Sequence, residues 1–156
     1  FTVNKSFRLV DLPGYGFAKA SKESRAVFSD FAAHYFERSQ YLAGVLVLID
    51  ASIAPQAVDL DFVRWIGELQ VPFVLVFTKT DKKKKGGGDH LDHIEMFMRD
   101  IGGWFDEPPA IYPVSALKNM GIKELQGLLM DVTAQWSSNT SVSGSRNGGG
   151  NGGKTR

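Results

Sequence analysis

Cysteine is absent from this sequence of 156 residues, which excludes disulfide bonds and metal sites built on thiolates. Long apolar runs are also absent: none approaches the ~20 residues that a membrane-spanning helix needs, so we expect no membrane partner. The sequence also has no initiator methionine, because it begins at Phe1 and passes directly into strand-like sequence. We therefore expect an N-terminally truncated chain, with any targeting segment before Phe1.

An excess of positive charge is lacking as well. The net charge is +1, but Arg146, Lys154 and Arg156 lie close to the C-terminus, and the remaining chain carries 15 basic and 17 acidic residues. This balance provides no general basic surface for nucleic acid. Residues 137–156 consist mainly of Ser, Asn, Gly and Thr, a composition that cannot form a core. We expect one folded domain over residues 1–136 and a disordered tail over residues 137–156.

Within residues 1–136, apolar residues recur with two alternating patterns. Short continuous runs indicate buried strands, and runs with helical spacing follow them. After an N-terminal hairpin whose second arm is the first strand, we expect strands at 6–10, 44–50, 73–77 and 110–115, and helices at 21–38, 55–70, 89–101 and 122–132. This alternation predicts an α/β fold with a mostly parallel sheet and helices on both faces.

Three of the loops that follow predicted strands carry polar residues. They begin at Asp11, Thr78 and Ser115. The carboxyl ends of parallel strands lie at one edge of a sheet, and open α/β sheets bind ligands just beyond that edge. We therefore expect the three loops to converge on one rim and to form a ligand site there.

The loop after the third strand has the chemistry of a purine site. A rigid carboxylate at Asp81 can accept two parallel hydrogen bonds, and guanine offers two adjacent donors in its N1–H and 2-amino groups. The aliphatic stem of Lys79 can cover the face of an aromatic ring while its ammonium stays in water. The N–H of Ala116 can donate to the exocyclic oxygen of the base. Adenine lacks this pattern, so discrimination could reach roughly 10⁴-fold.

The loop Asp11-Leu12-Pro13-Gly14 suits the phosphate side of such a site. Read alone, Asp-x-x-Gly after a strand is more often an ordinary turn. In this context the carboxylate of Asp11 suits a Mg²⁺ ion bound through water, and the N–H of Gly14 suits a terminal phosphate.

Three segments together resemble a known family. Residues 11–19 (Asp-Leu-Pro-Gly-Tyr-Gly-Phe-Ala-Lys), 78–81 (Thr-Lys-Thr-Asp) and 115–117 (Ser-Ala-Leu) are similar to the last three nucleotide motifs of the EngB family of GTPases. The resemblance covers essentially the whole predicted fold. It implies a P-loop GTPase-like sheet that lacks its first strand, phosphate loop and first helix. It also implies binding of GTP or GDP with Mg²⁺, slow GTP hydrolysis, and a partner among the precursors of the large ribosomal subunit.

The resemblance also implies roles for individual residues. Asp11 would contact Mg²⁺ through water. The phosphates would be bound by Asp11, Leu12, Pro13, Gly14 and Tyr15, and the guanine base by Thr78, Lys79, Asp81, Lys82, Ser115 and Ala116. Tyr15 stands where many GTPases have a glutamine that orients the attacking water, so we assign no catalytic base.

The phosphate-binding loop of the family has no counterpart in the folded part of this sequence. Residues 148–155 satisfy the Walker pattern letter by letter, but we reject this match because no strand precedes it and no helix can follow it. Without that loop, three or four charge-assisted hydrogen bonds of ~1.5–3 kcal/mol each are lost. We expect this chain alone to bind GTP weakly and to hydrolyse it negligibly.

Two alternatives remain open at this stage. The chain could be a nucleotide-independent binding module for ribosomal precursors, acting through the four lysines at 82–85. Those lysines could equally be a solvated loop, and the Lys-rich and Gly-rich insertion at 82–88 is similar to plant organellar members of the family. The resemblance therefore points to a chloroplast or mitochondrion, with the cytoplasm as the alternative. We expect a monomer, and we expect no metal at His90 and His93, since no third ligand is near.

Overall fold

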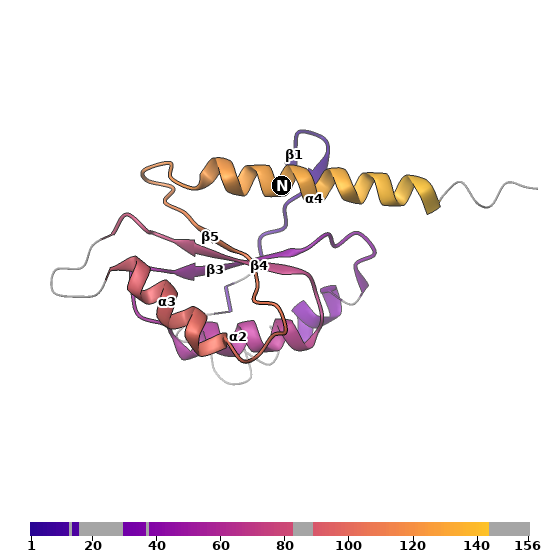
Figure 1. The fold of residues 1–156 in the computed structure, drawn as a ribbon. Coiled ribbons are helices and arrows are strands. Elements are labelled where there is room, and N and C mark those ends of the chain that lie inside the picture. Colours follow the sequence, from indigo (N-terminus) through magenta and orange to yellow (C-terminus); the bar gives the residue numbers. More distant parts are fainter. Residues whose placement is uncertain (13, 16–29, 37, 83–88, 144–156) are drawn as a thin grey trace, which may run out of the picture.

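The computed structural model describes residues 1–12, 14–15, 30–36, 38–82 and 89–143 of the chain. Its centre is a parallel three-stranded sheet in the order β3-β4-β5 (Figure 1). The strands are β3 (Val45–Asp50), β4 (Phe73–Thr78) and β5 (Ile111–Pro113). In the register, Asp50 lies opposite Thr78 and Phe77 lies opposite Pro113, so the carboxyl ends of all three strands share one edge.

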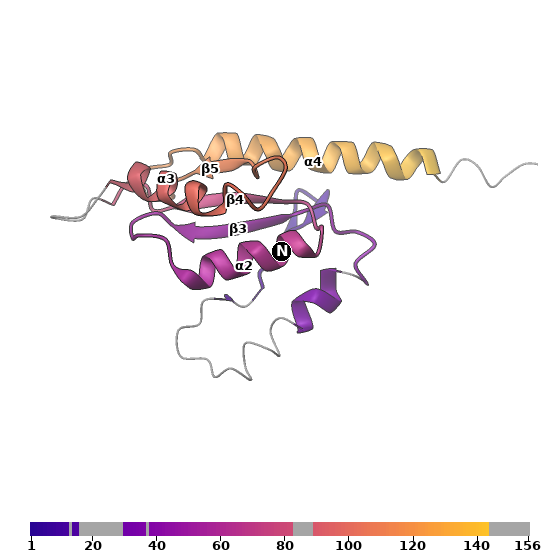
Figure 2. The ribbon, with the colours of Figure 1, turned by 60° about the horizontal axis from the view of Figure 1, so that its bottom comes forward.

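Helices cover both faces of this sheet, as predicted. Helices α2 (Ala57–Glu68) and α3 (His90–Ile101) lie on one face, and α4 (Ile122–Ser143) lies on the other (Figures 1 and 2). The core is on the side of α2 and α3, where the rings of Phe77 and Phe97 meet edge to face with centroids 5.5 Å apart. The predicted α/β class is therefore confirmed, with the rigid core directly beneath β4.

Local sequence explains where α3 begins. The side chain of Asp89 accepts a hydrogen bond from the N–H of His90 at 2.7 Å, and the N–H of Asp89 donates to the side chain of Asp92 at 2.9 Å. This capping box satisfies N–H groups that have no partner within the helix. The helix predicted over residues 89–101 therefore begins at His90, with Asp89 as its N-cap. Helix α2, by contrast, begins at Ala57, two residues after the predicted start at Pro55.

The N-terminal hairpin forms, but it does not join the parallel sheet. Strands β1 (Thr2–Val3) and β2 (Phe7–Arg8) make a separate antiparallel sheet of two strands. The turn between them has positive φ at Asn4 and Lys5, 49° and 55°, which is typical of the tight turns in hairpins. The prediction that residues 6–10 form the first parallel strand is wrong. Strand β2 is two residues long and, among the described residues, pairs with β1 across a short turn, which costs little chain entropy.

The C-terminal boundary also differs from the prediction. Helix α4 continues to Ser143, so residues 137–143, which we assigned to a disordered tail, are helical. No glycine or proline occurs between residues 128 and 143, and polar residues alone do not stop a helix. The Walker-like match at 148–155 lies outside the described residues.

The helix predicted over residues 21–38 is described only in part. Residues 21–29 lie outside the described residues, and residues 30–36 and 38 are helical. No helix in the described ranges is long and apolar enough to cross a membrane.

Candidate functional site

The loop after β4 leaves the strand in a sharp turn. Lys79 has a positive φ of 59°, which is uncommon for a residue with a side chain. The N–H of Lys82 closes the turn by donating to the carbonyl of Lys79 at 3.1 Å. The N–H of Thr80 donates to the carbonyl of Val114 at 3.3 Å, so the turn is tied to the segment that follows β5. Backbone hydrogen bonds therefore fix the positions of Lys79 and Asp81 relative to each other.

The loop after β5 is organised around Ser115, whose side chain is fully buried. Its backbone pairs with Met120 through two hydrogen bonds of 3.0 Å, and its hydroxyl oxygen accepts from the N–H of Lys118 at 3.0 Å. The same hydroxyl donates to the Oδ1 atom of Asp81. The contact joins the two loops that the sequence placed on one rim.

The environment of Asp81 favours a carboxylate. The hydrogen bond from Ser115 is the main cause that lowers its pKa below the ordinary value, and Lys118 and Lys82 add positive charge nearby. The neighbouring Ala116 is exposed, and in the described part of the chain its N–H donates to no protein acceptor. The two loops thus present an acceptor with a full negative charge next to a backbone donor.

Replacing Ser115 by alanine is expected to raise the pKa of Asp81 toward that of an ordinary carboxyl group, because its main stabilising hydrogen bond is lost. In the native chain the folded pKa lies below the unfolded one. The stability that Asp81 contributes is therefore present above the unfolded pKa and is lost as the pH falls through the folded pKa. The Ser115→Ala variant should lose less stability on acidification. A titration of the Asp81 carboxyl carbon by NMR measures the shift.

Ser52→Ala is the matched control for this titration, because Ser52 binds Asp50 and should leave Asp81 unchanged. An Asp81 titration curve that is identical in the native chain and in Ser115→Ala would contradict the role of the hydroxyl.

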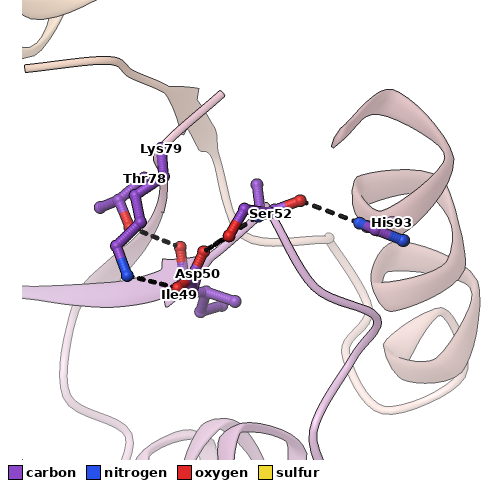
Figure 3. Close-up of polar contacts among 7 residues, drawn as sticks. Ile49, Asp50, Ser52, Thr78, Lys79 and His93 are labelled. Atoms are coloured by element: carbon purple, nitrogen blue, oxygen red, sulfur yellow. Dashed lines mark hydrogen bonds and ion pairs between the residues drawn. The ribbon is translucent and has the colours of Figure 1, made fainter. Parts of the chain in front are cut away.

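Lys79 makes a contact that sequence reasoning missed. Its ammonium forms an ion pair with the Oδ2 atom of Asp50, the last residue of β3 (Figure 3). The signal in the sequence was an acidic residue ending a buried strand, but only the register of β3 and β4 shows that Asp50 lies beside the loop. The candidate site therefore extends across the ends of all three strands.

The segment from Asp11 to Tyr15 is placed differently from the loops after β4 and β5. Asp11 and Gly14 are exposed, Leu12 packs against the core, and Pro13 lies outside the described residues. Among the described residues, no hydrogen bond joins Asp11 or Gly14 to the loops after β4 and β5. The hydrogen bond from Ser115 to Asp81 confirms that the loops after β4 and β5 meet, whereas the place of Asp11 and Gly14 on the same rim stays a prediction.

Tyr15 is directed into the packing between α2 and β3. Its ring stacks on Phe62 with centroids 4.0 Å apart and planes 8° apart, and its hydroxyl donates to the carbonyl of Leu48 at 2.9 Å. Burial raises the pKa of Tyr15, and the nearby carboxyl of Asp59 raises it further. In this conformation Tyr15 is a structural residue that covers the outer edge of β3.

Comparison with known proteins places the chain in a family. No family model matches the sequence. The chain is 36% identical over 143 residues to "Probable GTP-binding protein EngB" of Flavobacterium johnsoniae, covering 90% of this chain and 67% of that protein. A protein of the same name from Bacteroides fragilis is 34% identical over 142 residues, covering 88% and 68% of the two chains. This chain belongs to the EngB family. The resemblance predicted from its motifs is therefore confirmed.

Other relatives extend the comparison to plants and to solved structures. The EngB-family chain is 44% identical over 126 residues to "GTP-binding protein At2g22870" of Arabidopsis thaliana, of which it spans 42%. The crystal structure of a probable GTP-binding protein EngB aligns with 80% of the chain and 77% of its own length, at a TM-score of 0.58 and 20% identity. Apo elongation factor SelB of Methanococcus maripaludis aligns at a TM-score of 0.52. These structures support the fold.

Proposed function

We propose that this chain recognises guanine nucleotides, as an EngB-type GTPase, through the loops after β4 and β5. The observation that carries the proposal is the hydrogen bond from Ser115 to Asp81, which fixes an ionised carboxylate at the carboxyl edge of the sheet. The carboxylate accepts from guanine N1–H and the 2-amino group, and the exposed N–H of Ala116 donates to the base oxygen. Thr78, Lys79 and Lys82 complete the pocket, with the stem of Lys79 against the ring.

The chemistry of these donors and acceptors fits guanine better than adenine. Adenine has an amino group where guanine has its oxygen, so it would oppose a donor to the N–H of Ala116. It also has no 2-amino group for Asp81. Unpaired polar groups in a bound complex are costly, and sites of this type reject analogues strongly.

The phosphate side of the proposed site is the segment from Asp11 to Tyr15. Asp11 and Gly14 are exposed and accessible to a ligand, which is compatible with a water-mediated contact to Mg²⁺ and with a terminal phosphate. Leu12, Pro13 and Tyr15 belong to the same segment by resemblance. Among the described residues, no three His, Asp or Glu side chains gather as a direct metal site, so we expect Mg²⁺ to be held mainly through water and nucleotide oxygens.

The cellular role is proposed from the family resemblance. We infer that the nucleotide-bound chain acts as a monomer in assembly of the large ribosomal subunit, with a ribosomal precursor as its partner. The Arabidopsis relative supports a plant origin and a chloroplast or mitochondrial location. GTP hydrolysis is part of this proposal only together with a phosphate-binding loop, and its water-positioning group is unassigned because Tyr15 points toward Leu48.

A protein-observed NMR titration tests the base preference directly. GDP and ADP are titrated against the chain in the presence of Mg²⁺, and we expect GDP to bind at least about 10²-fold more tightly than ADP. The backbone amides of Asp81, Ser115 and Ala116 should shift with GDP. Equal affinity for GDP and ADP, or no binding of either, would refute the proposal and favour a binding module that works without nucleotide.

A further inference from the structure

Asp50 is held more firmly than a surface carboxylate usually is. Its Oδ1 atom accepts from the backbone N–H of Ser52 at 2.9 Å and from the Ser52 hydroxyl at 2.6 Å, while its Oδ2 atom pairs with the ammonium of Lys79. Figure 3 shows Lys79 reaching back from the turn after β4 to meet it. Ser52 therefore fixes the orientation of the carboxylate that faces Lys79.

The charge state of Asp50 suits this contact. Burial acts to raise its pKa, but the hydrogen bonds from Lys79 and Ser52 outweigh burial, and the pKa lies below the ordinary value. The group is thus a carboxylate at neutral pH. It gives Lys79 a charged partner under the conditions in which a nucleotide would bind.

The backbone around Asp50 is rigid as well. The hydroxyl of Thr78 donates to the carbonyl of Ile49 at 3.1 Å, and the N–H of Ala51 donates to the carbonyl of Thr78 at 3.0 Å. A ring nitrogen of His93 lies 2.9 Å from the carbonyl of Ala51, which ties α3 to the same point (Figure 3). The carboxylate is consequently part of the framework that joins β3, β4 and α3.

Lys79 is therefore constrained at both ends. Its backbone has a positive φ and accepts a hydrogen bond from the N–H of Lys82, and its ammonium is bound to Asp50. A free lysine side chain loses much rotamer entropy when it is ordered on a ligand. A lysine that is already extended loses less, so a ligand that packs on its stem binds more tightly.

We propose that Asp50 is a positioning residue for guanine recognition, which holds the ammonium of Lys79 so that the lysine stem covers the base bound by Asp81. This inference rests on the proposed function. The ion pair is half exposed, with relative exposures of 49% for Lys79 and 28% for Asp50, and pairs of this kind contribute little to stability. Its main effect is accordingly on binding.

A double-mutant cycle with GDP tests the proposal on the full chain. Asp50→Asn, Lys79→Met and the double variant are compared by NMR titration, with Met retaining an unbranched stem without the charge. We expect Asp50→Asn to weaken GDP binding by about 3–10-fold with an unchanged melting temperature. In the Lys79→Met background the same substitution should change affinity less than twofold, because Asp50 acts only through Lys79.

Asp61→Asn is the matched control, since it removes the same charge from an exposed position on α2 and should leave GDP affinity unchanged. Suppose that the native chain prefers GDP to ADP, and that the Asp50→Asn variant binds GDP as tightly as the native chain or more tightly. The role of Asp50 is then refuted, while the proposed function stands. If Asp50→Asn lowers GDP affinity equally in the native and Lys79→Met backgrounds, the role of Asp50 is also refuted. If the native chain shows no preference for GDP over ADP, the proposed function itself fails.

Discussion

Replacing Asp81 by asparagine is expected to transfer the base preference of this chain from guanine to xanthine. In the proposed site the native carboxylate accepts two hydrogen bonds from guanine, and a bond to a charged group contributes about 1.5–3 kcal/mol. The asparagine oxygen can still accept from guanine N1–H, so the substitution removes the bond to the 2-amino group, which corresponds to a fall in GDP affinity of at least about 10–10²-fold. Affinities for GDP and for xanthosine diphosphate, measured in parallel by NMR titration, give the change in preference directly.

The direction of the change follows from the donors of the two bases. An asparagine side chain has one acceptor and one donor, so its amide group meets the 2-amino group of guanine donor to donor. Xanthine has a carbonyl at that position and can accept from the amide. The hydroxyl of Ser115 can still donate to the asparagine oxygen, because it donates to Oδ1 in the native chain. The variant should therefore keep its loop geometry while changing its ligand.

Asp100→Asn provides a control with the same change in net charge at an exposed position near the end of α3. It should bind GDP as the native chain does. An Asp81→Asn variant that is folded and still prefers GDP to xanthosine diphosphate would disprove the assignment of Asp81 to the base.

The meeting of Asp81 and Ser115 could be predicted because it depends on one rule. Each residue follows a short apolar run that reads as a buried strand, and parallel strands place their carboxyl ends at one edge. The rule needs no knowledge of side-chain contacts. It does not extend to Asp11, because the segment before Asp11 pairs in a hairpin and is not part of the parallel sheet.

The pairing of Asp50 with Lys79 could not be predicted in the same way. It depends on the register of β3 against β4, which sets Asp50 opposite Thr78, and on the positive φ of Lys79, which turns its side chain back toward β3. Neither quantity can be read from apolar periodicity. The orientation of Tyr15 raises the same difficulty, since its stacking on Phe62 joins residues 47 positions apart.

The loop that carries Ser115 and Ala116 is expected to depend on Gly121. This residue has a φ of +67°, and a Cβ atom there would lie 2.1 Å from the carbonyl oxygen of Pro113. Gly121→Ala should lower the free energy of unfolding by at least about 3 kcal/mol, since strain at the positive φ adds to a backbone clash. The melting temperature, measured by circular dichroism, should fall by about 10 °C.

Gly127→Ala separates this effect from the general preference of helices for alanine. Gly127 lies within α4, and a Cβ atom there would meet nothing within 4 Å, so alanine should stabilise the chain by about 0.5–1 kcal/mol. The two substitutions are chemically identical, and only the backbone conformation and the nearby carbonyl of Pro113 distinguish the sites.

Because Gly121 follows the pairing of Ser115 with Met120, its replacement should also weaken GDP binding. Equal melting temperatures for Gly121→Ala and the native chain would contradict the proposed close approach to β5.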